Sequence, residues 1–224
     1  MFYLVKTPRI LHAAFPQALW RMPARGKKVY LTFDDGPHPA ITPFVLEAMS
    51  AVSAQATFFC IGNNVLRYPK VFEQIIAAGH TVGNHTFHHV NGWKVGAAAY
   101  LEDIQRASEL IPSTLFRPPY GRITLAQLSG LRVSFPRMQC VMWDVLSADF
   151  DVRVSAEQCV RNVIRGAEPG SLVVFHDSEK AFPRLKGSLV AVLNKLKENG
   201  YELCSLKNDQ AGYGEKQAQH TGYK

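Results

Sequence analysis

Short apolar runs alternate along the chain with longer stretches in which apolar residues recur at helical spacing. The runs are rich in β-branched and aromatic residues and are continuously apolar, so they predict strands that are buried on both faces. The predicted strands are residues 29–33, 56–61, 81–85, 115–119, 140–145, 171–176 and 201–206. The predicted helices are residues 42–53, 69–78, 97–110, 124–130, 155–166 and 183–199. This alternation is typical of an α/β fold with a parallel sheet covered by helices.

Seven parallel strands are compatible with two architectures, an open doubly wound sheet and a closed or distorted β/α barrel. The periodicity does not distinguish between them. A chain of 224 residues is long enough to bury one sizeable core, and it contains no internal repeat and no internal linker. We therefore expect one domain.

The positive charge is concentrated near the N-terminus. The net charge is +7, and six Lys and Arg residues precede the first acidic residue, Asp34. We expect residues 1–27 to pack their apolar side chains on the domain, and peripheral contact with an anionic membrane surface is the alternative. A nucleic-acid partner is not expected, because the excess charge is terminal and is not spread over a face with interleaved aromatic residues. The oligomeric state is left open.

Neither a membrane span nor a secretory signal is expected. No apolar stretch approaches the ~18 residues that a spanning helix needs. The apolar beginning of the chain is interrupted by Lys6, Pro8, Arg9, His12 and Pro16. A cytoplasmic or membrane-peripheral location is thus favoured over an exported one. The polar, Gly- and Gln-rich residues 207–224 are predicted to be disordered.

Residues that carry chemistry lie at or near the carboxyl ends of the predicted strands. They are Asp34, Asp35, His85, His89, Arg117, Asp149 and His176. Because the carboxyl ends of parallel strands in β/α folds meet at one rim, where active sites are built, we expect these side chains to converge.

The segment GNHTFHH offers two imidazoles, His85 and His89, at a spacing that places both on one face of a helical turn. Together with one carboxylate they would form a set of two histidines and a carboxylate with open positions for a divalent metal. Thr86 stands where the HExxH motif has its glutamate, so a base would come from elsewhere, and the second aspartate of the Asp34–Asp35 pair is available. Simpler interpretations also exist: DDG is common turn chemistry, and His176 alone could be a core histidine.

These motifs, in this order, resemble those of the NodB-like polysaccharide deacetylases, carbohydrate esterase family four. TFDDGP resembles the first motif, HTFHH the second, RPPYG the third, ADF a degraded fourth and VFHD the fifth. The resemblance runs from about residue 28 to 206, so it implies a catalytic domain over 28–206. It also implies a distorted (β/α) barrel, of NodB-homology type, with about seven parallel strands.

The resemblance further implies a role for each matching residue. Asp35, His85 and His89 would hold one divalent metal, zinc first, with cobalt, nickel or manganese as alternatives. Asp34 would be the general base and Arg117 its partner.

On the substrate side, the resemblance implies His176 as the general acid and Asp149 as the residue that orients it. Pro119 and Tyr120 of the third motif would line the oxyanion site, to which Tyr120 contributes its backbone N–H. Phe150 stands where many relatives have Trp, and Val174 where they have Leu, so these two would alter the pocket wall.

The implied activity is metal-dependent hydrolysis of N-acetyl groups from glycans that contain N-acetylglucosamine. Peptidoglycan-type substrates rank first and chitin-like oligomers second. Such chemistry needs an acidified water, a base, and an acid for the departing amine. Two alternatives remain: hydrolysis of cyclic amides or ureides on the same barrel, and a non-catalytic sugar-binding protein.

Overall fold

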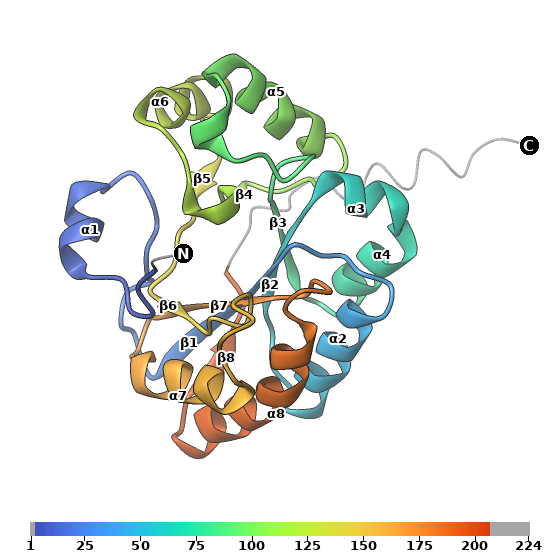
Figure 1. The fold of residues 1–224 in the computed structure, drawn as a ribbon, viewed down its shortest axis with the longest axis vertical. Coiled ribbons are helices and arrows are strands. Elements are labelled where there is room, and N and C mark those ends of the chain that lie inside the picture. The colour runs from blue at the N-terminus through green and yellow to red at the C-terminus, as the bar shows by residue number, and fades with distance from the viewer. Residues whose placement is uncertain (1–2, 207–224) are drawn as a thin grey trace, which may run out of the picture.

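The computed structural model describes residues 3–206 of the chain (Figure 1). The tail for which the sequence predicts disorder, residues 207–224, lies outside the described residues. The strands of the described part are β1 (Lys28–Asp34), β2 (Thr57–Cys60), β3 (Thr81–Asn84), β4 (Leu115–Phe116), β5 (Gln139–Cys140), β6 (Val145–Leu146), β7 (Leu172–His176) and β8 (Glu202–Cys204). Its α-helices are α1 (Arg9–Ala14), α2 (Ile41–Ala51), α3 (Gly62–Arg67), α4 (Pro69–Ala77), α5 (Ala97–Ser108), α6 (Leu125–Ser134), α7 (Ala156–Gly166) and α8 (Phe182–Glu198). Two short 3₁₀ helices, η1 (Gly92–Lys94) and η2 (Pro119–Gly121), complete the list.

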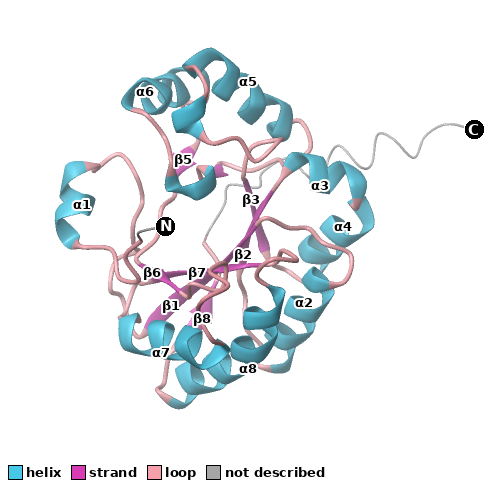
Figure 2. Ribbon diagram, in the orientation of Figure 1, coloured by secondary structure: helices cyan, strands magenta, loops and turns pink. Residues whose placement is uncertain are grey.

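The strands form one parallel sheet in the order β5-β4-β3-β2-β1-β7-β6, and β8 pairs with the beginning of β1. The sheet is curled into a half-barrel, and the helices surround its outer face (Figure 2). The predicted fold class, an α/β barrel that is distorted and has about seven parallel strands along its path, is confirmed.

The central strand β1 shows how the sheet separates a core from a site. Leu31 and Phe33 are fully buried in the main core beneath the helices. Side chains alternate along a strand, so Thr32 and Asp34 point to the opposite, inner face of the barrel. The strands β2 and β3 are buried at every position, which confirms the prediction of strands covered on both faces.

The strand predicted at 140–145 is wrong as one element, because two strands with different partners replace it. β5 pairs with β4, whereas β6 pairs with β7 at the other edge of the sheet. The N-terminal segment fills the gap between them: Leu19 N donates to Cys140 O at 2.8 Å, and Leu146 N donates to Val5 O at 2.8 Å. A continuous apolar run does not reveal which segment pairs with each part of it.

Smaller differences have local causes. The fourth strand is shorter than predicted, since Pro118 and Pro119 lack the backbone N–H that would continue the ladder. The helix predicted at 124–130 continues to Ser134. The helices α1 and α3 were not predicted, and each spans only six residues.

A buried carboxylate fastens the N-terminal segment to the barrel. Asp144 is 1% exposed, and its Oδ2 accepts hydrogen bonds from Lys6 Nζ at 2.8 Å and from Ser171 Oγ at 2.5 Å. Removing a partner from such a buried charge is costly, so Lys6 fixes where the segment lies. None of the helices in residues 3–206 combines the length and apolarity that crossing a membrane requires.

Candidate active site

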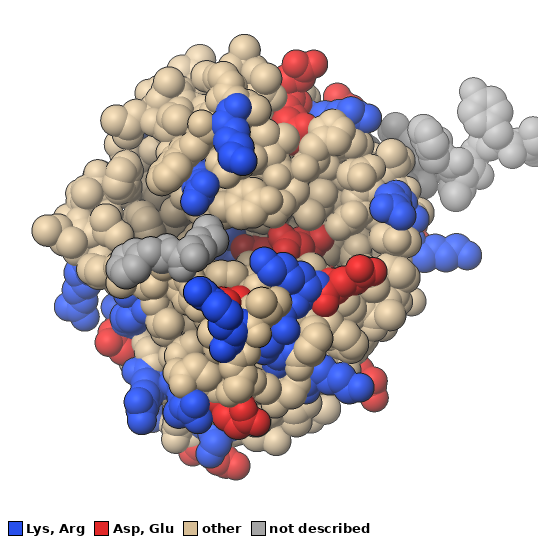
Figure 3. Space-filling view, in the orientation of Figure 1, with Lys and Arg blue, Asp and Glu red and all other residues tan. Residues whose placement is uncertain are grey.

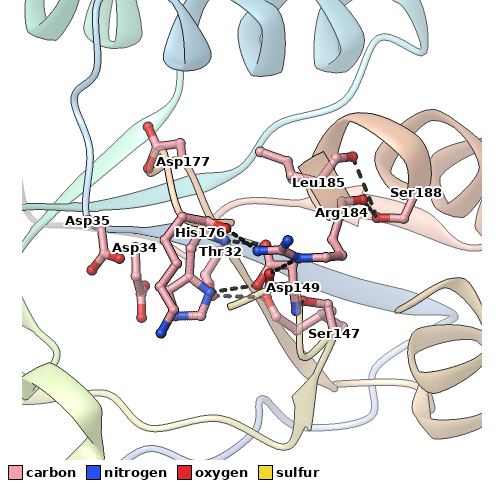
Figure 4. Close-up of polar contacts among 12 residues, drawn as sticks. Thr32, Asp34, Asp35, Ser147, Asp149, His176, Asp177, Arg184, Leu185 and Ser188 are labelled. Atoms are coloured by element: carbon pink, nitrogen blue, oxygen red, sulfur yellow. Dashed lines mark hydrogen bonds and ion pairs between the residues drawn. The ribbon is translucent and has the colours of Figure 1, made fainter. Parts of the chain in front are cut away.

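The carboxyl ends of β1 and β7 bring two of the expected groups together. The register pairs Asp34 directly with His176. Figure 4 shows the Asp34 and Asp35 side chains on one side of His176 and Asp149 on the other. In Figure 3 acidic atoms lie in a hollow at the centre of this face, with Lys and Arg side chains close by. The predicted convergence of strand ends at one rim thus holds for these residues.

Asp34 is held by a fully buried guanidinium. Arg117 Nη1 donates to Asp34 Oδ1 at 2.6 Å and to Thr32 Oγ1 at 2.7 Å. Its Nη2 donates to Met142 O at 3.0 Å, and its charge lies 4.1 Å from the centre of the Phe59 ring. Burial lowers the pKa of Arg117, but the Asp34 carboxylate opposes that shift. The pair therefore gives Asp34 a single fixed orientation and offsets its repulsion from the next carboxylate.

Asp35, His85 and His89 form a cluster in which one ligand atom from each lies within 4.8 Å of the others. Asp35 Oδ1 is 3.7 Å from His85 Nε2 and 3.2 Å from His89 Nε2. His85 is 2% exposed and donates from Nδ1 to Arg117 O at 2.7 Å. That bond fixes the tautomer in which Nε2 is left with a lone pair directed at the cluster.

The donor set fits a divalent metal. Burial lowers the pKa of His85 to about 4, so its ring is neutral at neutral pH. Burial alone would raise the pKa of Asp35, but hydrogen bonding to His89 and the positive charge of His176 hold it below its usual value. Neutral imidazoles and an ionised carboxylate are the forms that bind divalent transition metals, and three protein ligands leave positions open for water or substrate.

The turn that carries Asp35 is fixed by Asp177, a residue that the sequence reasoning did not single out. Asp177 Oδ1 accepts from Gly36 N at 3.0 Å, and its Oδ2 accepts from Thr42 Oγ1 at 2.5 Å. A Cβ on Gly36 would lie 2.1 Å from Asp177, so only glycine fits there. Burial raises the pKa of Asp177 to about 7. Its position directly after His176 was the available signal.

The loop with the two histidines is fixed by Asp103 of α5. Asp103 Oδ2 accepts from the backbone N–H groups of Phe87 and His88, each at 2.9 Å, and Oδ1 pairs with His88 Nδ1 at 2.5 Å. Thr86 and His89 have positive φ angles of 63° and 56°, which non-glycine residues adopt at a cost. Asp103 was missed too, although an acidic residue on the buried stripe of a helix was a signal.

We expect the substitution Asp103→Ala to weaken metal binding about 10- to 100-fold, as is typical when a residue that orients a metal ligand is lost. The variant leaves two buried N–H groups without acceptors and frees the loop that positions His89. Competition with a fluorescent zinc chelator measures the affinity. Glu102→Ala, the exposed neighbour on the same helix, is the matched control and should bind as the wild type does. Equal affinities for both variants would contradict this role.

His176 and Asp149 form a second polar pair at the rim. Asp149 is fully buried, and its two oxygens accept from His176 Nδ1 and from the His176 backbone N, each at 2.8 Å. Burial lowers the pKa of His176, but the Asp149 carboxylate outweighs burial and raises the pKa to about 9. Arg184 Nε donates to Asp149 O at 2.9 Å and holds this part of the chain in place. The imidazole is therefore cationic at neutral pH, with Nε2 left for a substrate.

The remaining expected residues differ in accessibility. Phe150 packs edge-on against His176 at 5.3 Å, and Tyr120 is 51% exposed with its ring 4.6 Å from that of His89. Pro119 is buried. Val174 is 1% exposed and lies one inward position before His176 on β7, so we assign it to interior packing instead of substrate contact.

A residue outside the expected set extends the wall that Phe150 forms. The Tyr3 ring lies 5.1 Å from that of Phe150, and Tyr3 Oη donates to Asp151 Oδ2 at 2.9 Å. The N-terminal segment therefore reaches the edge of the site. Sequence motifs did not indicate this contact, because 148 residues separate Tyr3 from Asp151.

Comparison with known proteins agrees with this geometry. The family model for polysaccharide deacetylase matches residues 21–132. The chain is 31% identical over 193 residues to a peptidoglycan-N-acetylglucosamine deacetylase of Bacillus cereus, covering 84% of this chain and 90% of that protein. It is 33% identical over 164 residues to a chitooligosaccharide deacetylase of Azorhizobium caulinodans, covering 70% and 77%.

Among solved structures, the peptidoglycan N-acetylglucosamine deacetylase Bc1960 superposes with a TM-score of 0.78 at 30% identity. The match covers 89% of this chain and 95% of that one. A shared fold at this identity, together with the Asp-His-His cluster, leaves little room for another assignment. The chain belongs to the NodB-like polysaccharide deacetylases of carbohydrate esterase family four, and it is a hydrolase of carbon–nitrogen bonds.

Proposed function

We propose that the chain removes N-acetyl groups from glycans that contain N-acetylglucosamine, with peptidoglycan-type glycans first and chitin-like oligomers second. The observation that carries this proposal is the separation of roles at the rim. Asp34 is paired with Arg117 and stands apart from the Asp35–His85–His89 cluster, while His176 lies on the other side of Asp34 with its own partner, Asp149. A binding protein would need no such division between base, metal and acid.

We propose that Asp35, His85 and His89 hold one divalent ion, zinc first and cobalt, nickel or manganese as alternatives. When bound, such an ion acidifies water and polarises a carbonyl. Asp34 takes the water proton, since its carboxylate is held at one oxygen by Arg117 and is free at the other. The backbone N–H of Tyr120, in a 3₁₀ turn with φ of 60°, would add a donor for the charge that develops on the acetyl oxygen.

His176 supplies the proton to the amine leaving group in this scheme. An amine departs as a neutral molecule only after protonation, and the imidazolium that Asp149 stabilises is the acid at hand. Phe150 and Tyr3 form an aromatic wall beside His176, on which the apolar face of a sugar ring could stack. Residues 28–206 would form the catalytic unit, and residues before 28 would pack against its open edge.

The substitution Asp149→Asn should shift the pH profile towards acid. Only the protonated form of His176 donates, so kcat/KM falls as pH rises through the His176 pKa of about 9. Asp149 is the principal group that raises this pKa, so its loss moves the alkaline limb to lower pH by more than one unit, an effect of about 1.4 kcal/mol per unit. The measurement is kcat/KM against pH on an acetylated oligosaccharide.

Asp151→Asn is the control for this shift, because Asp151 contacts Arg153 and Tyr3 and makes no hydrogen bond to His176. Its alkaline limb should stay where the wild type has it. An unshifted limb in Asp149→Asn would remove Asp149 from the assignment.

Acetate release from a substrate panel tests the proposed function. The panel contains chitooligosaccharides, peptidoglycan fragments and cyclic amides or ureides, and it is run on metal-stripped protein and again with zinc, cobalt, nickel or manganese. Acetate release that returns with a metal supports the proposal and ranks the substrates. Opening of cyclic amides alone would favour the amidohydrolase alternative. Metal binding without turnover would favour the non-catalytic sugar-binding protein.

A further inference from the structure

The helix α1 is apolar and yet packs almost nothing. Among the α-helices of residues 3–206 it is the one with no buried residue. Ile10 is 76% exposed, Leu11 37% and Phe15, just after the helix, 38%. A helix of six residues is not stable by itself in water, so its conformation depends on the segment that holds it.

The orientation of α1 directs these side chains away from the barrel. His12 stacks on Trp20 at 5.2 Å with 13° between the rings, and Trp20 Nε1 donates to Phe15 O at 3.0 Å. Successive helix residues are about 100° apart, so Ile10 and Ala14 lie roughly opposite His12. The side of α1 that carries Ile10 thus faces solvent, and in Figure 1 the helix projects from the body of the molecule.

Cations surround this apolar side. Arg9 on α1 has a side chain that is 83% exposed. Glu168, an acidic residue that contacts the segment, is within 3.8 Å of three cations: Lys6 at 3.7 Å, Arg9 at 3.8 Å and Arg21 at 3.1 Å. Since six basic residues and no acidic ones occur before Asp34, the charge of this region is strongly positive.

A shallow cavity of about 290 Å³ adjoins the same segment. It lies between the segment and α7, and its lining includes Val5, Lys6, Arg161 and Arg165. Lys6 Nζ also donates to Gly166 O at 2.7 Å, which joins α7 to the segment. Three cations around one hollow suit an anionic headgroup better than a neutral ligand.

We propose that α1 and the basic residues beside it dock the protein on an anionic lipid bilayer. Ile10, Leu11 and Phe15 enter the interfacial layer, and the arginines and lysines face the phosphate groups. An apolar stripe without hydrogen-bonding groups, bordered by charge of one sign, is the pattern of interfacial segments. A second copy of this chain would present the same positive charge and be repelled. Tyr3 of the same segment contacts Phe150, so docking would hold the active-site rim near the membrane.

Vesicle co-sedimentation of the full 224-residue chain tests this inference without any reference to catalysis. The vesicles are phosphatidylcholine alone and phosphatidylcholine mixed equally with phosphatidylglycerol, each at low and high salt. We expect sedimentation with the anionic vesicles at low salt and little with the neutral ones. The double substitution Ile10→Ser and Phe15→Ser should lower the partition coefficient about tenfold, and Arg9→Glu should lower it on anionic vesicles.

Val133→Ser is the matched control, because Val133 is 82% exposed on α6 and lies outside the segment. It should partition as the wild type does, and circular dichroism should give all variants similar melting temperatures. Equal partition of the double variant and the wild type would overturn the proposal. A wild type that sediments with neither vesicle, or one whose exposed helix instead forms a concentration-dependent dimer, would overturn it as well.

Discussion

Replacement of His89 by glutamine is expected to lower kcat/KM by about 10⁴-fold, the largest effect that we predict for a single substitution. His89 Nε2 is 3.2 Å from Asp35 Oδ1, and it completes the cluster that would hold the metal. An amide side chain is a poor ligand for a transition metal, so affinity should fall together with activity. Because His89 is 23% exposed, the change should cost the fold little.

The measurement has two parts, metal affinity by chelator competition and acetate release at saturating metal. His88→Gln is the matched control, since it alters the adjacent imidazole of the same loop, which pairs with Asp103 instead of joining the cluster. We expect its metal affinity to stay within about tenfold of the wild type, because the backbone bonds to Asp103 remain. Similar losses in both variants would mean that the loop matters and that the ligand assignment is wrong.

Asp34→Asn should lower kcat/KM about 10³-fold while metal affinity stays close to that of the wild type, since general-base catalysis typically contributes 10²- to 10⁴-fold. Asp34 is 4% exposed and is bonded to Arg117, not to the metal cluster. Asparagine keeps the shape and can still accept from Arg117, but it cannot take a proton. The separation of activity from metal binding is what distinguishes a base from a ligand.

Stability has to be measured beside the rate. Removing one member of a buried ion pair costs about 3–5 kcal/mol, and the hydrogen bond that asparagine retains should keep the loss near the lower end. Rates are therefore compared below the melting temperature of the variant. Glu179→Gln is the control on the rim, with a carboxylate side chain that is 86% exposed. Activity of Asp34→Asn within tenfold of the wild type would refute the assignment of the base.

Most of the site could be predicted from the chain itself, because its residues follow buried strands. Continuous apolar runs identify strands covered on both faces, and parallel strands end at one rim, so Asp34, Asp35, His85 and His176 could be placed together without coordinates. The choice between an open sheet and a barrel came from the motif resemblance, since periodicity is the same in both.

The residues that hold this site in position were less visible. Asp103 lies 15 and 16 residues from the N–H groups that it binds, and Asp177 is 141 residues from Gly36. Hydrophobic periodicity shows that a position is buried, but it does not show which donor meets a buried carboxylate. Such partners become known only when the elements are placed in space.

The sequence by itself determined the class of the fold, the order of its elements and the chemistry at its strand ends, since these depend on local pattern and on motifs. The tertiary structure alone decided that residues 140–145 divide into two strands, with the N-terminal segment bonded between them. It also decided that Tyr3 reaches Phe150 and that α1 stands exposed. The physical reason is that pairing and docking depend on which surfaces meet, and residues far apart in the chain supply those surfaces.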